Sequence, residues 1–184
     1  MNSEQNQAVS QAATEIKRNG HLRSQLRRAD SASNVFGLAE AHTFDKALRG
    51  ALPWLTKHEN VPDECLILIA HRIVKLPEKK DSDQSKFVSL AALLGGRDEQ
   101  DRALSGLRFQ RLMHARAGDD RLRQMRRALS MLKQPVHPFA VVDAYLDLHH
   151  PTHARRFAND YFNGNTKPAA QPPADSASDQ GLSP

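Results

Sequence analysis

Residues 104–133 read LSGLRFQRLMHARAGDDRLRQMRRALSMLK, two helical patterns that flank one turn around Gly118. In the second pattern the apolar residues recur at spacings of three and four, so they share one helix face. They are Leu122, Met125, Leu129 and Leu132. At about 100° per residue, most of the basic residues point away from that face. This helix is therefore predicted to pack on one side and to be basic on the other.

The first pattern carries apolar residues on nearly every side, which predicts a helix that is buried over most of its surface. They are Leu104, Leu107, Phe109, Leu112 and Met113. Arginines also lie on this stretch, and a buried arginine must pair with a carboxylate or extend its head to the surface. Asp119 and Asp120 open the second pattern, where carboxylates suit a positive helix N-terminus, and one of them is predicted to be the N-cap.

Basic charge is concentrated in this part of the chain. Residues 97–133 contain ten Lys or Arg and five Asp or Glu, a surplus of five that equals the net charge of +5 of the whole chain. A second basic cluster lies within residues 15–30, and the pI is about 9.6. This balance favours a polyanionic partner, most often nucleic acid.

The length of 184 residues fits one domain, or two small halves, and no apolar run is long enough for a membrane span. The polar N-terminus lacks the apolar segment of a secretory signal. The single cysteine, Cys65, excludes an internal disulfide and fits a reducing, cytoplasmic compartment. Because Cys65 lies in the apolar run CLILIA, we expect a buried and inert thiol.

Helical periodicity persists along the chain and no alternating strand pattern does, so the predicted fold is all-α, a compact multi-helix bundle. Residues 1–14 are predicted to be a loose N-terminal stretch, 15–163 a helical domain and 164–184 a disordered, Pro-rich tail. A helix over about 35–49 is predicted to be capped by Ser33 or Asn34. Residues 77–86 are predicted to be a mobile charged loop.

Catalytic patterns are missing from the sequence. Gly95-Gly96 lacks the lysine and hydroxyl residue of a phosphate-binding loop and is interpreted as a helix stop. His149 and His153 have the spacing of zinc ligands on a helix, but Pro151 interrupts that helix. With no nucleophile motif and no distinctive carboxylate pair, we expect no enzyme activity, no cofactor and no metal.

Four motifs occur in an order that is typical of one family. They are LRRAD at 26–30, RFQRL at 108–112, RLRQMRRAL at 121–129 and FANDYF at 157–162. Together they resemble the CasB family, the small subunit of the type I-E CRISPR surveillance complex called Cascade. The resemblance covers roughly residues 20–162. His114 stands where the family often carries Arg, and the family often has Trp near the positions of His149 and Phe157.

The resemblance implies a non-catalytic, all-helical subunit that holds the guide RNA–target DNA R-loop and the displaced strand through their backbones. Its implied partners are the guide RNA, the target DNA, the backbone and large subunits of Cascade, and a second copy of itself. Arg126 and Arg127 are the stronger nucleic-acid-binding candidates, because Arg108 and Arg111 could instead tie helices together. The full candidate set is Arg27, Arg28, Arg108, Arg111, Arg116, Arg123, Arg126 and Arg127.

Two alternatives stay open at the level of the sequence. Residues 104–133, with Gly118 in the turn, also fit a helix-turn-helix DNA-binding transcriptional regulator, which would bind a specific DNA sequence. An oligomeric adaptor whose basic face meets an acidic protein is the other, and its assembly would survive nuclease treatment.

Overall fold

The protein is described from a computed structural model that covers residues 3–35, 37–71, 88–96, 100–133 and 136–163. Within these ranges the chain forms nine α-helices and two short 3-10 helices, which confirms the all-α prediction. The elements are α1 (Ser3–Arg18), α2 (Gly20–Arg28), η1 (Ala32–Asn34), α3 (Ala39–Ala51), η2 (Pro53–Lys57), α4 (Val61–His71), α5 (Leu90–Gly95), α6 (Gly106–Met113), α7 (Asp119–Met131), α8 (Pro138–His149) and α9 (Pro151–Asn163).

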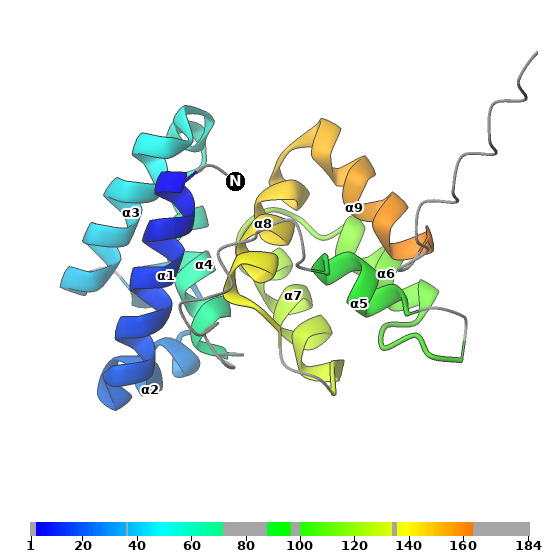
Figure 1. Ribbon diagram of the computed structural model, residues 1–184, viewed down its shortest axis with the longest axis horizontal. Coiled ribbons are helices and arrows are strands. Elements are labelled where there is room, and N and C mark those ends of the chain that lie inside the picture. Colours follow the sequence, from blue (N-terminus) through cyan, green and yellow to red (C-terminus); the bar gives the residue numbers. More distant parts are fainter. Residues whose placement is uncertain (1–2, 36, 72–87, 97–99, 134–135, 164–184) are drawn as a thin grey trace, which may run out of the picture.

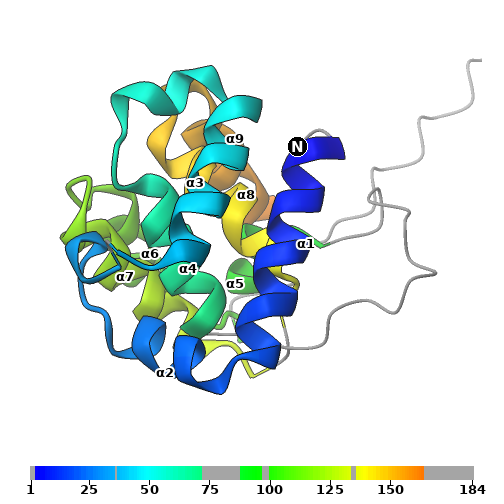
Figure 2. The same cartoon turned by 90° about the vertical axis from the view of Figure 1, so that its left-hand side faces the viewer.

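The helices gather in chain order into two halves (Figure 1). α1 to α4 lie together on one side, where α1 and α3 run side by side (Figure 2). α5 to α9 form the other side, and α8 contacts helices of both halves. The predicted charged loop at 77–86 and the predicted tail at 164–184 lie outside the described residues.

α4 and α8 form the centre of the core. Every residue of α4 from Val61 to Ala70 is buried, and α8 is buried along most of its length. Both helices are mainly apolar and are covered by other helices on most sides, although α4 also buries Asp63 and Glu64 and α8 buries Asp147 and His149. The thiol of Cys65 lies in this core, fully buried, and burial raises its pKa well above the ordinary value, in agreement with the predicted inert thiol.

The prediction of a loose stretch at residues 1–14 is wrong for residues 3–14, which lie in α1. Val9, Ala13 and Ile16 are buried there, at spacings of four and three, and α1 packs against α3 and α8. This apolar stripe is narrow and flanked by Gln, Asn and Ser, so the average polarity of the segment hides it. Tertiary contacts rather than strong local propensity therefore stabilise the helix.

Three local predictions also require correction. α6 is not buried on most sides, because Leu107 is 60% exposed while Phe109 and Leu112 are buried. Neither aspartate is the N-cap of α7. That position belongs to Gly118, whose φ of 87° suits glycine, and both aspartates lie in the first turn. α3 begins at Ala39 after Leu38, since Ser33 and Asn34 belong to η1.

Glycine permits the close contact between α5 and α9. A Cβ atom added to Gly95 would lie 1.9 Å from the carbonyl oxygen of Tyr161 and 2.8 Å from its carbonyl carbon. Tyr161 is fixed in turn, because its hydroxyl donates a 2.7 Å hydrogen bond to the Leu104 carbonyl and its ring stacks on Phe109 at 3.7 Å. The α9 backbone therefore has little freedom to move away.

We expect Gly95→Ala to destabilise the protein by at least the ~1–3 kcal/mol that overpacking usually costs. Gly50→Ala is the matched control, because Gly50 lies in a helix with nothing within 4 Å of a new Cβ. It should be neutral or stabilising by up to about 1 kcal/mol, the difference in helix propensity. Urea unfolding measures both changes, and a Gly95→Ala protein as stable as its parent would contradict the close contact.

A buried polar cluster joins α4 to α8. The Tyr145 hydroxyl donates a 2.8 Å hydrogen bond to the Glu64 carboxylate, and His149 Nε2 lies 4.0 Å from the same oxygen. Both His149 ring nitrogens are without a hydrogen-bond partner in the described part of the chain. Burial, with Arg121 and His58 nearby, lowers the pKa of His149 from 6.5 to about 3, so the imidazole is neutral at pH 7.

Lowering the pH below 6.5 should therefore remove stability, because the unfolded chain takes up a proton at His149 that the folded chain does not. Burial raises the pKa of Asp63 to about 6 and that of Glu64 above its usual range, which acts in the opposite direction. The test is thus a comparison. From pH 7 to pH 5 the parent should lose about 2 kcal/mol more than His149→Asn in urea unfolding.

Exposed His21 provides the control, since His21→Asn should follow the parent at both pH values. If His149→Asn and the parent lose the same stability on acidification, the buried imidazole is not the group that titrates.

Candidate nucleic-acid interface

Two helices that bear candidate arginines rest on the same support. α2 and α7 are far apart in sequence, but both pack against α4. The chain that leaves α2 passes beside α7 (Figure 2). The contact is made by Arg126, which donates hydrogen bonds of 2.7 Å to the Ala29 carbonyl and 2.9 Å to the Arg27 carbonyl. The end of α2 is therefore attached to the middle of α7.

The first basic groove lies along α7 and has a volume of about 550 Å³. Arg123 and Arg127 are exposed and one turn apart, so they share a face of the helix. Neither guanidinium forms a hydrogen bond or an ion pair with another residue in the described ranges. The groove is lined by Asp30, Ser31, His71, Asp119, Arg123, Arg126, Arg127 and Ser130. The carboxylates of Asp30 and Asp119 also line the groove, so its lining carries both signs of charge.

The second basic groove lies on α2 and has a volume of about 500 Å³. Gly20, Arg23, Ser24, Arg27 and Arg28 line it. Arg27 and Arg28 are exposed in the last turn of α2, where positive charge also complements the negative end of the helix. Their guanidinium groups form no hydrogen bond or ion pair with other described residues.

Arg23 is a groove residue that the sequence analysis did not select. It lies one turn before Arg27, so the spacing of four was the available signal. Its Nε atom is buried and has no hydrogen-bond partner within the described part of the chain. The side chain thus adds a donor and a charge to the wall of the second groove.

The other predicted arginines lie elsewhere. Arg108 on α6 directs Nη1 to the Met131 sulfur at 3.4 Å. Arg111 on the same helix and Arg116 in the following loop are exposed, and neither lines either groove. The structure therefore brings together the candidates of α2 and α7 and leaves those of α6 and its loop outside.

The structure adds contacts to the sequence ranking of these arginines. That ranking favoured Arg126 and Arg127 for nucleic acid, because Arg108 and Arg111 could instead tie helices together. Arg126 is half-buried and donates to the backbone carbonyls of Arg27 and Ala29 at the end of α2, Arg108 on α6 contacts Met131 on α7, and Arg111 forms no such contact with described residues. Arg127 keeps its candidate status, since it is exposed in the first groove.

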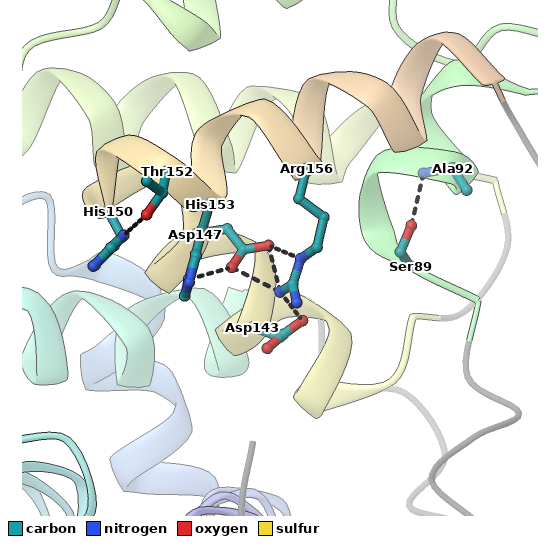
Figure 3. Close-up of polar contacts among 8 residues, drawn as sticks. All are labelled: Ser89, Ala92, Asp143, Asp147, His150, Thr152, His153 and Arg156. Carbon is teal, nitrogen blue, oxygen red and sulfur yellow. Dashed lines mark hydrogen bonds and ion pairs between the residues drawn. The ribbon is translucent and has the colours of Figure 1, made fainter.

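Arg156 belongs to a charged cluster that joins α8 to α9 (Figure 3). Arg156 on α9 donates to the buried Asp147 carboxylate on α8 at 2.7 Å and 2.8 Å, and to Asp143 at 3.2 Å. His153 Nδ1 lies 3.4 Å from Asp147. Burial raises the pKa of Asp147, although the Arg156 hydrogen bonds favour the charged carboxylate. The guanidinium of Arg156 is therefore engaged between two helices.

His149 and His153, whose spacing resembles that of zinc ligands, lie in different surroundings. His149 is buried beside Glu64 at the end of α8, whereas His153 lies on α9 after the break at Pro151. Among the described residues no three His, Cys, Asp or Glu side chains are arranged to hold a metal ion. No described helix has both the length and the apolar content to cross a lipid bilayer.

Comparison with known proteins gives one finding. A family model described as CRISPR-associated protein Cse2 matches residues 22–162, a span that contains the first basic groove and every arginine of the second, and that excludes α1. No curated protein and no solved structure matches the chain. Because the family model covers well over half of the sequence, the chain belongs to the Cse2 family, the CasB small subunits of the type I-E CRISPR Cascade complex.

Proposed function

We propose that this Cascade subunit is non-catalytic and holds nucleic acid through its backbone, without sequence preference. The observation that supports this proposal is the pair of neighbouring grooves on α2 and α7, whose exposed arginines have no partner among the described residues. Charged groups that are free of protein partners and lie side by side suit a polyanion that has regularly spaced phosphates.

The energetic role of such contacts follows from R-loop formation. The RNA–DNA heteroduplex is about as stable as the DNA duplex that it replaces, so modest contacts with the backbone tip the exchange. Arginine suits this role because its guanidinium is always charged and matches phosphate geometry. The subunit would thereby stabilise the guide RNA–target DNA hybrid and the displaced strand.

Arg27, Arg28, Arg123 and Arg127 are the proposed primary contacts. Arg111 and Arg116, which are exposed, and Arg108 would extend the surface from α6. The proposed partners are the guide RNA, the target DNA, the backbone and large subunits of Cascade and a second copy of the chain, in the cytoplasm.

Removing two groove arginines should flatten the dependence of log affinity on log salt by about 1.4–1.8, at roughly 0.7–0.9 for each lost phosphate contact. The variants are Arg27→Ala with Arg28→Ala, and separately Arg123→Ala with Arg127→Ala. Binding of the purified chain to a mixed-sequence oligonucleotide is measured by anisotropy over a salt series. Because these side chains have no described protein partner, the helical signal and melting temperature should stay unchanged.

Lys46→Ala with Lys57→Ala is the control, since both lysines are exposed outside the grooves and their loss removes the same charge. If the control and groove variants change the salt slope equally, overall charge rather than the grooves explains the binding. Tight binding of one DNA sequence over others would instead favour a helix-turn-helix regulator.

Within the assembled complex, the groove variants should weaken target-DNA binding more than retention of the guide RNA. The hybrid and the displaced strand form only with target, so backbone contacts with them are lost selectively. Gel-shift titration with target DNA, together with quantification of co-purified guide RNA, measures the two effects. Loss of guide RNA with unchanged affinity for target would contradict this assignment.

A further inference from the structure

The unusual arginine of the interface is Arg126, because its guanidinium is directed at protein backbone. Nη1 donates to the Ala29 carbonyl at 2.7 Å and Nη2 to the Arg27 carbonyl at 2.9 Å. Both acceptors belong to the last turn of α2 or to the residue that follows it. This arginine thus bridges segments about one hundred residues apart in the sequence.

This contact requires the planar guanidinium group of arginine, which can donate two hydrogen bonds at once. The last carbonyls of a helix have no intrahelical donor and need one from elsewhere. A guanidinium presents several N–H groups in a fixed plane and can serve two carbonyls at once, whereas a lysine ammonium is a point charge on a flexible stem. Replacing Arg126 with Lys would therefore keep the charge and lose the two-point attachment.

The contact also lies where the two grooves meet. Arg126 lines the first groove together with Arg123 and Arg127. One of its acceptors is the backbone of Arg27, whose side chain lines the second groove with that of Arg28. A contact at a single residue thus joins the helix that carries one arginine pair to the end of the helix that carries the other.

We propose that Arg126 is a positioning residue, which fixes the arginines of α2 relative to those of α7 so that one nucleic-acid backbone contacts both pairs. The inference rests on the proposed function and deepens it. Arg126 acts through Arg27 and Arg28 by holding the end of α2, and its own charge contributes little to phosphate binding.

The test compares two conservative substitutions in the full chain. Arg126→Lys and Arg127→Lys both keep the charge, but only the first removes a two-point attachment. A labelled, mixed-sequence single-stranded DNA of about 40 nucleotides serves as the probe, at a temperature where every variant retains the parental helical signal. Arg126→Lys should lose at least about tenfold in affinity, while Arg127→Lys stays within about threefold of the parent.

The salt dependence separates positioning from a single contact. If the α2 arginines leave their place, Arg126→Lys should flatten the salt slope by more than one contact, about 1.4 or more. A parental slope and affinity for Arg126→Lys would overturn the proposal. So would a lower melting temperature with unchanged affinity of the folded protein, which is the result expected of a purely structural bridge.

A double-mutant cycle gives a second measurement. In a protein that already carries Arg27→Ala and Arg28→Ala, adding Arg126→Lys should cost little further affinity, because its effect passes through those residues. Additive losses would contradict positioning. If the Arg27 and Arg28 changes themselves leave affinity unaffected, the proposed function fails at that groove, whatever Arg126 does.

Discussion

The packing of α4 against α8 is the interaction on which the rest of the structure depends. Ten consecutive residues of α4 are buried, and each leucine or isoleucine among them contributes about 1.5–3 kcal/mol relative to exposure. α1, α2, α3 and α7 all pack on α4, and α9 packs on α8. The two halves of the molecule therefore meet at α4 and α8, where α1 also packs on α8 and α7 on α4, and the Tyr145–Glu64 hydrogen bond lies inside this seam.

This seam has a direct consequence for the candidate interface. α2 and α7 carry the arginines of the two grooves, and both rest on α4, so the core supports both basic surfaces. Arg126 adds a polar contact on top of that support. A surface for a repeating polyanion requires fixed spacing, because phosphates recur at regular intervals along a strand.

Among the described residues, several arginines differ in their partners and so fall into two kinds. Arg49, Arg126 and Arg156 donate to carboxylates or carbonyls and hold the fold together. Arg27, Arg28, Arg123 and Arg127 have no such partner among the described residues and line the grooves. Net charge alone does not separate these kinds, since every arginine contributes the same +1. Their hydrogen bonds do separate them. The arginines without a described partner are therefore the ones to test for nucleic-acid binding in this member of the Cse2 family.

The sequence by itself determined the all-α class, the buried apolar run around Cys65, the interruption at Pro151 and the family, because periodicity, proline and local motifs are properties of neighbouring residues. Only the tertiary structure decided that residues 3–14 are helical, since the stripe of Val9 and Ala13 is stabilised by distant helices. The tertiary structure likewise decided which of the described arginines hold two segments together and which have no partner among the described residues. Helical spacing assigns a side chain to a face of its helix. Which distant part of the chain that face contacts, as Arg126 contacts residues about a hundred positions earlier, depends on how the helices pack.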